Sequence, residues 1–402
     1  MSEVAQAPHS SPDGRIPQLR FPEFDGVWES RLLKDAVKIN PRSGELPDEF
    51  IYIDLESVKK GYLIKETQIN KIGAPSRAQR LLNKNDVIFQ TVRPYQKNNY
   101  FFNLDGDYVA STGYAQLRVL NSPEFLYQAL HTDRFVYDVM ARSTGTSYPA
   151  INSTDLSKIK LNLPTKPEQQ KIAAFLTAVD NKIEQLSTKQ VLLGEYKKGL
   201  MQQIFSQAIR FRAGDTPGQP LLPNGNSPSG SDFPNWEEKR LGDLCEITTG
   251  KLDANAMVEG GQYRFYTCAK EYYKIDDYAF DTDALIVSGN GANVGYIHHY
   301  QGKFNAYQRT YVLDSFTDNI IFVKFVLDEY LHKRIMKEKN EGNTPYIVMG
   351  TLTDMKINLP SFSEQTKIAI FLSSIDSKIE QVGKQLDESK QFKKALLQQM
   401  FV

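Results

Sequence analysis

The chain has 402 residues, of which 48 are basic and 48 acidic, so its formal net charge at pH 7 is zero. A protein that binds polyanions non-specifically needs a broad basic surface, so this balance argues against that class. Apolar residues make up 41% of the chain, enough to build cores, yet no run approaches the roughly 18 apolar residues of a membrane span. The two cysteines, Cys245 and Cys268, provide no disulfide framework and favour a reducing, cytoplasmic compartment.

A short tail and one globular domain are expected before residue 164. Residues 1–14 lack the basic and apolar layout of a signal peptide and are expected to be a disordered tail. Residues 15–163 form the first predicted domain, in which Gly, Asn and Asp turns separate stretches of strand composition. Strands are predicted at 51–58, 85–92, 99–104, 107–111, 114–120 and 158–164, a helix at 123–142 and a loop at 143–156.

Residues 164–210 are predicted to form one long helix. No proline occurs between Glu168 and Phe205, and apolar residues recur at alternating steps of four and three, the 3.5-residue period of a coiled coil. The helix would extend roughly 57 Å at 1.5 Å per residue, and an ordinary amphipathic core helix is the alternative. Its apolar stripe comprises Ile172, Leu176, Val179, Ile183, Leu186, Leu193, Leu200 and Ile204.

The second half of the chain repeats this order. A linker rich in Pro, Gly and Ser is predicted at 211–232, a second domain at 233–359 and a second long helix at 360–402. Trp28-Glu29 and Trp236-Glu237 open the two halves in similar surroundings. Strands are predicted at 263–275, 283–289, 295–300, 302–307, 309–314 and 356–360, and a helix at 319–338.

The two long helices are copies of one segment. Residues 164–205 and 360–401 align without a gap at an offset of 196, and 19 of the 42 aligned positions are identical. Two helices with one apolar stripe each are expected to bury those stripes against each other. The polar residues Gln190, Lys197, Ser389 and Lys393 interrupt the stripes and are expected to fix the register or to leave room for a partner. The second stripe comprises Ile368, Leu372, Ile375, Ile379, Val382, Leu386, Leu396 and Met400.

No stretch predicts a catalytic or metal site. The turn Gly289–Gly295 resembles a dinucleotide fingerprint, but its last glycine lies one place late and no helix clearly follows. His298 and His299 are adjacent, so on a strand they face opposite ways and cannot chelate one ion together. We therefore expect a non-catalytic chain that binds no metal or cofactor of its own. A nucleotide-dependent enzyme built on the Gly289–Gly295 turn is kept as an alternative.

Several predicted loops combine residue types that contact nucleic acids with aromatic residues. Arg can fork onto guanine, Asn and Gln can bridge adenine edges, and Lys holds phosphates. Basic residues outnumber acidic ones by nine to two between Lys59 and Lys97, whereas residues 233–356 carry 14 basic and 18 acidic side chains, so contacts there must come from local loops. The candidates for DNA binding are Arg77, Arg80, Gln90, Arg93, Lys97, Asn98, Tyr114, Lys270, Tyr272, Asn290, Asn293, Tyr307 and Arg309, with Tyr95, Gln96, Asn99, Tyr273 and Gln308 beside them.

From about Arg20 to Phe401 the chain resembles the DNA-specificity (S) subunit of a type I restriction–modification system. The resemblance rests on the paired PxxxEQxKIAxFL segments, the KKxLxQQxF endings and the strand region GANVGYIHHYQGKFNAYQRTYVL. It implies a mixed α/β fold, in which two α/β target-recognition domains are separated by two long antiparallel helices that form a coiled-coil spacer, with an internal pseudo-two-fold repeat.

The resemblance also implies a function and partners. Each domain would recognise one half of a bipartite double-stranded DNA target, and the helices would set the spacing. The helices, through Ile172, Leu176, Val179, Ile183, Leu186 and the corresponding Ile368, Leu372, Ile375, Ile379 and Val382, would also dock two DNA adenine methyltransferase (M) subunits. Restriction/translocase (R) subunits would join through the complex, and S-adenosylmethionine, ATP and Mg would bind to the partners. A coiled-coil scaffold with globular ends that bind protein or small ligands is the alternative from a different class.

Overall fold

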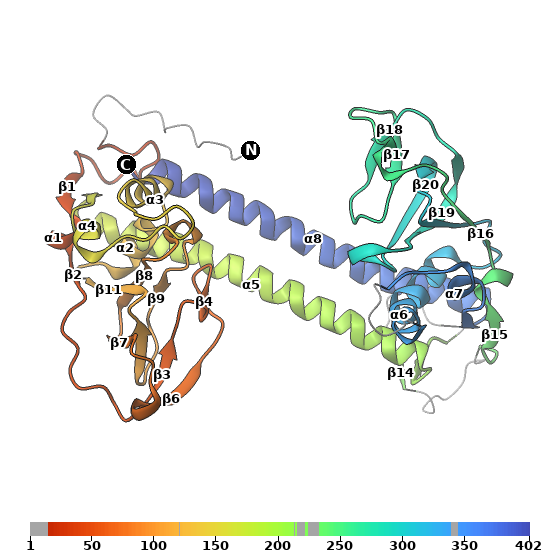
Figure 1. Cartoon of the computed structure of the whole chain (residues 1–402), viewed down its shortest axis with the longest axis horizontal. Helices are drawn as coiled ribbons and strands as arrows, with labels where there is room; N and C mark the ends of the chain where they lie inside the picture. The colour runs from red at the N-terminus through yellow and green to blue at the C-terminus, as the bar shows by residue number, and fades with distance from the viewer. Residues whose placement is uncertain (1–14, 120, 213, 215–221, 224–232, 339–344) are drawn as a thin grey trace. The chain divides into compact units, whose positions relative to one another are not determined.

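The computed structural model describes residues 15–119, 121–212, 214, 222–223, 233–338 and 345–402, which fall into two compact units (Figure 1). The predicted tail and most of the predicted linker lie outside the described residues. Unit 1 comprises the chain up to Ser187 together with Lys384–Val402, and unit 2 comprises Thr188–Gly383. Helices α5 (Lys166–Phe205) and α8 (Phe362–Met400) contribute to both units, which confirms two long helices in a mixed α/β fold.

Unit 1 contains two four-stranded sheets, in the orders β6-β3-β10-β7 and β2-β11-β8-β9. Phe89, Leu117 and Leu126 belong to the core that joins the second sheet to the short helices, whereas Ile88 and Tyr114 face a separate core with Ile53 from the first sheet. Its strands are β1 (Glu29–Leu32), β2 (Val37–Ile39), β3 (Glu49–Ile53), β4 (Val58–Lys59), β5 (Tyr62–Leu63), β6 (Thr67–Asn70), β7 (Ala78–Leu81), β8 (Asp86–Gln90), β9 (Tyr100–Phe101), β10 (Tyr108–Ser111), β11 (Tyr114–Val119) and β12 (Lys160–Leu163), and its short helices are α1 (Leu33–Ala36), α2 (Pro123–Ala129), α3 (Asp133–Met140) and α4 (Ser153–Ser157).

Two sequence predictions in unit 1 were wrong. The single helix expected at 123–142 is split into α2 and α3, because the Thr132 hydroxyl accepts a hydrogen bond from Phe135 N and begins a new helix. The loop expected at 143–156 contains the start of α4, which Asn152 caps by accepting from Asp155 N at 2.8 Å. In both places a local side-chain cap decides where a helix starts.

Unit 2 is built on a six-stranded sheet in the order β16-β21-β19-β20-β17-β18. Leu285 and Leu313 pack on one face with Phe322 of helix α6 (Ile320–Glu338), and Ile286 and Phe304 pack on the opposite face. The strands are β13 (Ile209–Arg210), β14 (Leu222–Pro223), β15 (Glu237–Arg240), β16 (Glu246–Thr249), β17 (Tyr263–Tyr266), β18 (Tyr273–Ile275), β19 (Phe280–Ser288), β20 (Ile297–Ala306), β21 (Thr310–Asp314) and β22 (Lys356–Leu359), with helices α6 (Ile320–Glu338) and α7 (Met349–Thr353).

The strand boundaries of unit 2 also differ from the prediction. The strand expected at 263–275 is two strands, β17 and β18, joined by a loop that carries Lys270 and Tyr272. The two strands expected at 295–300 and 302–307 are one strand, β20, which continues through Gly302 at φ 129°. Only glycine adopts that backbone conformation readily, so Gly302 allows the two expected strands to join into one.

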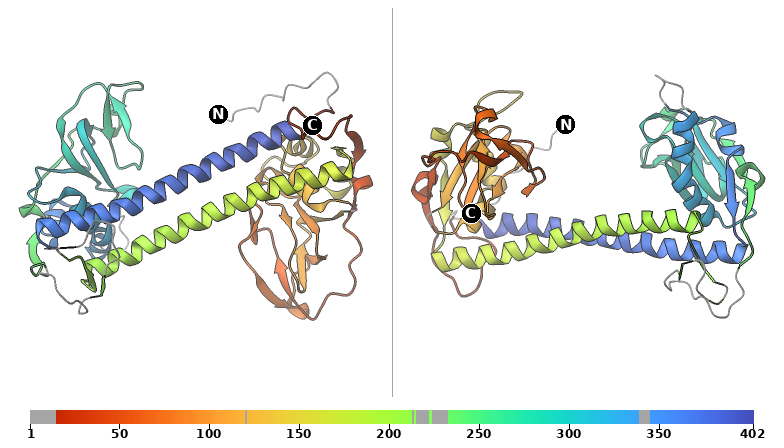
Figure 2. Two further views of the ribbon diagram at one scale, coloured as in Figure 1. Left: turned by 180° about the vertical axis from the view of Figure 1, so that it is seen from behind. Right: turned by 90° about the horizontal axis from the view of Figure 1, so that it is seen from below.

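Within each unit, α5 and α8 lie side by side and run antiparallel (Figures 1 and 2). In unit 1, Ile172 and Leu176 share a core with Leu396 and Met400, and in unit 2, Ile204 shares one with Ile368 and Leu372. The predicted burial of the stripes is confirmed for most positions. Val179, Leu193, Leu200 and Ile379 are half-buried, whereas Ile172, Leu176, Ile183, Leu186, Ile204, Ile368, Leu372, Ile375, Val382, Leu386, Leu396 and Met400 are buried.

Two polar interruptions of the stripes form equivalent ion pairs. Lys393 contacts Asp180 at 2.5 Å in unit 1, and Lys197 contacts Asp376 at 2.6 Å in unit 2. Each lysine and each aspartate lies 196 residues from its counterpart, so the two pairs are copies of one contact. A lysine in an apolar stripe favours the register that brings it to its carboxylate, which is the register function expected from the sequence.

A buried glutamate anchors the start of each long helix. In unit 1, Arg20 donates through Nε and Nη2 to the two Glu168 oxygens at 2.8 Å each, and the Trp28 indole donates to Glu168 at 3.3 Å. In unit 2, Arg210 and Trp236 contact Glu364 in the same way. Both carboxylates are essentially inaccessible to solvent, and a polar group buried in this way is stable only when hydrogen-bond donors such as these arginines compensate it.

Candidate nucleic-acid interface

In unit 1 three loops meet where strand β8 ends. Thr91 N donates to Gly113 O at 3.0 Å, and Ile151 N donates to Thr91 O at 3.0 Å. Arg93 N donates to Pro149 O at 2.7 Å, so the loop after β8 is tied to the turn before β11 and to the loop before α4. Backbone hydrogen bonds therefore fix three loops in one cluster, which we call the unit 1 loop cluster (residues 91–99, 111–113 and 144–151).

Unit 2 repeats this arrangement with different residues. Gly289 N donates to Arg309 O at 2.9 Å and Ile347 N donates to Gly289 O at 2.8 Å, at the end of β19. The bridge between Asn290 and Tyr346 matches that between Val92 and Ala150. These segments, together with the β17–β18 loop, are the unit 2 loop cluster (residues 267–272, 289–296, 307–309 and 345–347).

The loop cluster of unit 1 presents one arginine stacked on a tyrosine. The Arg93 guanidinium lies 4.2 Å from the Tyr148 ring centroid, and its Nε is buried without a hydrogen-bond partner in the described chain. Arg93 has φ 54°, a left-handed conformation that turns the chain sharply after β8. The corresponding position in unit 2, one residue after the bridge, is Gly291 at φ 78°.

The remaining predicted contacts of unit 1 are accounted for as follows. The Lys97 ammonium donates to Asp133 at 2.7 Å and to His131 O at 2.8 Å, and Asn98 accepts from Lys60 N, so both stabilise the loop. Arg77 is exposed, and its carbonyl accepts from Thr112 N beside the loop cluster. Arg80 lies half-buried on β7, and burial lowers the pKa of its guanidinium.

Two predicted contact residues belong to the interior instead. Tyr114 is 1% exposed, and burial raises the pKa of its hydroxyl, which donates to Asp54 O. Gln90 is 2% exposed, and its amide donates to Gln96 Oε1 at 2.9 Å. Asn99 is also buried and accepts from Gln90 N. In this structure neither Tyr114 nor Gln90 is accessible to a ligand, because the strands that carry them are buried at these positions.

The loop cluster of unit 2 is held together by side chains. Asn293 donates to Cys268 O at 3.1 Å, and the His298 ring contacts Ala269 O at 3.1 Å. Burial lowers the pKa of His298, so the neutral ring is favoured at this contact. Lys270 lies 5.9 Å above the Tyr296 ring, in the loop that these bonds position.

The other predicted contacts of unit 2 surround the same cluster. Tyr307 N donates to Tyr266 O at 2.9 Å, and Arg309, which is exposed, follows two residues later. Asn290 is half-buried and Tyr272 is 43% exposed. The structure thus brings together Lys270, Tyr272, Asn290, Asn293, Tyr307 and Arg309.

Sequence reasoning missed Tyr148, Arg264 and Tyr300. Arg264 and Tyr266 lie on one face of β17 because side chains alternate along a strand, which the sequence could have indicated. The stacking of Tyr148 on Arg93 joins residues 55 positions apart and carries no local signal. The cations and hydrogen-bond donors of each cluster suit the phosphates of a nucleic acid, and the exposed rings suit its bases. The polar side chains can also form hydrogen bonds with base edges.

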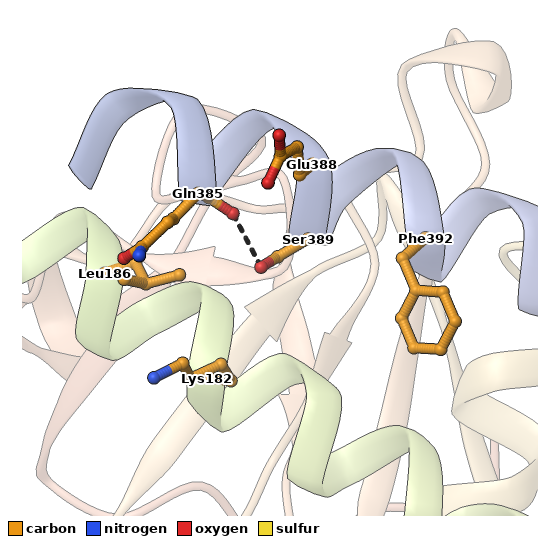
Figure 3. A pocket seen from close by; sticks show the side chains of 6 residues that line it. All are labelled: Lys182, Leu186, Gln385, Glu388, Ser389 and Phe392. Carbon is orange, nitrogen blue, oxygen red and sulfur yellow. Dashed lines mark hydrogen bonds between the residues drawn. The ribbon is translucent and has the colours of Figure 1, made fainter. Parts of the chain in front are cut away.

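A groove lies between the two long helices in unit 1 (Figure 3). Lys182 and Leu186 of α5 line it opposite Gln385, Glu388, Ser389 and Phe392 of α8. Ser389, which interrupts the apolar stripe, donates to Gln385 O at 2.7 Å along its own helix, and Phe392 is exposed.

In the part of the chain that the structure describes, no helix is long and apolar enough to cross a membrane.

Comparison with known proteins assigns most of the chain to one family model. The model described as the type I restriction modification DNA specificity domain matches residues 26–193 and 234–388. The EcoDI specificity subunit of Escherichia coli is 41% identical over 167 residues, 40% of this chain and 37% of that protein. The MjaVIII specificity subunit of Methanocaldococcus jannaschii is 24% identical over 287 residues, 64% of either chain. This chain thus spans between about a third and two thirds of the length of these relatives.

Solved structures support the fold. The S subunit of a type I restriction–modification system from M. genitalium matches 96% of this chain and 99% of its own, with a TM-score of 0.64 at 18% identity. A chain from a study of complex assembly in a type I system matches 92% of this chain and 96% of its own, with a TM-score of 0.52 at 22% identity. At these identities the likeness concerns the arrangement of elements and leaves the target sequence open.

Proposed function

The chain belongs to the type I restriction–modification DNA specificity family, and from this we propose that it is the sequence-specific DNA-binding subunit of a type I complex. Each unit would recognise one half of a bipartite double-stranded target through its loop cluster. The helices α5 and α8 would set the spacing between the halves.

One observation carries the proposal: the two loop clusters are built alike and lined differently. The backbone bond from Thr91 to Gly113 corresponds to that from Gly289 to Arg309, and the Val92–Ala150 bridge corresponds to the Asn290–Tyr346 bridge. The side chains at these positions differ between the units. A backbone arrangement that is repeated in the two units with different side chains suits two modules that recognise different base sequences in one duplex.

The long helices are the proposed docking elements for the catalytic partners. Because α5 and α8 are copies of one segment, each unit offers a similar helical surface, and two methyltransferase (M) subunits would bind one each. Restriction/translocase (R) subunits would join through that complex. S-adenosylmethionine, ATP and Mg would then bind to these partners, and this chain would supply recognition without catalysis, in the cytoplasm.

The proposal is tested by sequencing the methylated adenines of cells that express the chain with its M subunit. We expect methylation at one bipartite sequence, two short motifs separated by a constant number of unspecified bases. Cells with the M subunit alone are the control and should lack this methylation. Methylation that does not depend on the chain, or that follows a single continuous motif, would contradict the proposal.

A further inference from the structure

The Arg264 guanidinium in unit 2 is in cation–π contact with two tyrosine rings. The guanidinium carbon lies 4.3 Å from the Tyr272 ring centroid and 4.2 Å from that of Tyr300. Tyr272 comes from the β17–β18 loop and Tyr300 from β20, so two separate elements hold the group. Cation–π contacts engage the π surface of the planar guanidinium, so its N–H edges are the groups that can bind a ligand.

One edge of the guanidinium is occupied and another is available. Nη1 donates to the Tyr266 hydroxyl at 3.2 Å, and among the described residues this is the one hydrogen bond of the Arg264 side chain. Nε and Nη2 form the remaining edge. Neither atom donates a hydrogen bond to a described residue, and neither is among the buried atoms that lack a partner, so both are accessible. This edge is therefore free to donate two parallel hydrogen bonds.

The same edge binds a carboxylate at other arginines of this chain. Arg20 and Arg210 direct Nε and Nη2 to Glu168 and Glu364, and Arg118 directs them to Asp86 at 2.9 Å each. The described part of the chain places no carboxylate on the corresponding edge of Arg264. A preorganised fork without its acceptor pair is expected to receive one from a ligand.

The position of Arg264 connects this fork to the proposed DNA interface. Tyr266, which accepts the Nη1 bond, also accepts a backbone hydrogen bond from Tyr307 N of the unit 2 loop cluster. Tyr272 belongs to that cluster, and the Lys274 ammonium lies 6.0 Å from the centroid of the same Tyr272 ring. The fork and the loop cluster therefore form one continuous surface of cations and tyrosines.

We propose that Arg264 determines specificity in the half-site bound by unit 2, donating from Nε and Nη2 to O6 and N7 of a guanine. The inference rests on the proposed function and adds to it a residue and a base. A phosphate offers the same pair of acceptors, but guanine is favoured because two rings fix the plane of the fork. A fixed plane matters for the flat edge of a base, whereas a phosphate is bound as well by a mobile lysine.

The test uses the full chain in complex with its M subunit and duplexes of the methylated target. The variant Arg264→Lys keeps the charge and removes the fork, and Arg240→Lys is the matched control. Arg240 is exposed, lies on β15 of the same unit and pairs with Asp354. Binding is measured for the target and for duplexes in which each base pair of the second half-site is replaced in turn.

We expect the wild-type complex to bind at least about tenfold more weakly when one particular G·C pair is replaced. In Arg264→Lys that discrimination should fall below about threefold, while the other positions and the first half-site keep theirs. Arg240→Lys should match the wild type. A second variant, Tyr272→Leu, should reduce the same discrimination in part, and Tyr272→Phe, which keeps the ring, should retain it.

The other outcomes are distinguishable. Wild-type discrimination in Arg264→Lys, together with equal weakening on all duplexes and a salt dependence lowered by about one phosphate contact in Arg264→Met, which removes the charge, would identify a phosphate contact and overturn the assignment to guanine. Unchanged affinity and unchanged discrimination in Arg264→Lys, Arg264→Met and Tyr272→Leu would overturn any contact of Arg264 with DNA. A wild-type complex that binds no duplex would overturn the proposed function itself, whereas a wild-type complex that binds normally confines any failure to Arg264.

Discussion

Replacing Glu168 by alanine tests whether the buried ion pair at the start of α5 stabilises unit 1. The change removes the acceptor of two Arg20 hydrogen bonds at 2.8 Å and of the Trp28 indole bond at 3.3 Å. Arg20 would then lie 14% exposed without its carboxylate, although the carbonyls of Asp25 and Gly26 still accept from it. The variant therefore leaves a mostly buried charge without its main partner.

The expected loss follows from these contacts. Removing one partner of a buried ion pair costs about 3–5 kcal/mol, and the lower end applies because Arg20 keeps two backbone acceptors and some solvent. With a urea dependence of about 2 kcal/mol per molar, a loss of about 3 kcal/mol lowers the unfolding midpoint by about 1.5 M. The double variant Arg20→Met/Glu168→Met should recover much of this loss, because it leaves no unpaired charge.

The assay follows the fluorescence of Trp28, which contacts the buried Glu168. The chain contains two tryptophans, and the variant Trp236→Phe leaves Trp28, in contact with Glu168, as the fluorescent reporter. Urea unfolding is followed in this background with and without Glu168→Ala. Glu29→Ala is the control, because Glu29 pairs with Arg31 on the exposed surface of the same unit and should leave the midpoint unchanged. A midpoint shift for Glu168→Ala below about 0.3 M would refute the reasoning.

Three further predictions concern pH, the first half-site and the spacing. Burial lowers the pKa of His131 from 6.5 to about 4, so unit 1 should lose stability as the pH falls from about 6.5 to about 4, because the unfolded chain binds the proton first. The urea midpoint of His131→Gln should fall less than that of the wild type over that range. An equal pH dependence of the midpoint in the two proteins would contradict the attribution of this effect to His131. Arg93→Lys should change the first half of the methylated target and leave the second half intact, and a change in both halves would argue against separate recognition. Inserting seven residues after Ser187 and after Gly383 lengthens each helix by roughly 10 Å, which should widen the gap by about three base pairs in the methylome, and an unchanged gap would argue against a spacer.

The helices and the order of elements could be predicted because their signals are local. The apolar stripe from Ile172 to Ile204 repeats every 3.5 residues, and α6 begins one residue from its predicted start. Where a single side chain decided the outcome, the prediction failed. Thr132 splits one expected helix into two, and Gly302 lies inside one strand where two separate strands, 295–300 and 302–307, were expected.

The candidate site was predicted less well because its residues meet over long distances in the chain. All five residues of β8 are buried, so residue type alone could not distinguish Gln90 from an exposed contact. Arg264 depends on Tyr300, which lies 36 positions later on a different strand. Arg93 and Asn293 were predicted correctly to lie between strands, whereas Arg309 was expected to open a strand and lies just before β21. The grouping of these residues depends on backbone bonds that only the folded chain defines.

The central claim is that each unit recognises its own half of one DNA target. The most direct measurement is the methylome of a chain in which residues 15–163 are replaced by the corresponding domain of another family member, expressed with the same M subunit. We predict that one half of the methylated sequence changes to the donor's motif, while the other half and the gap remain as in the wild type. A methylome identical to the wild type, or one in which both halves change, would contradict the account.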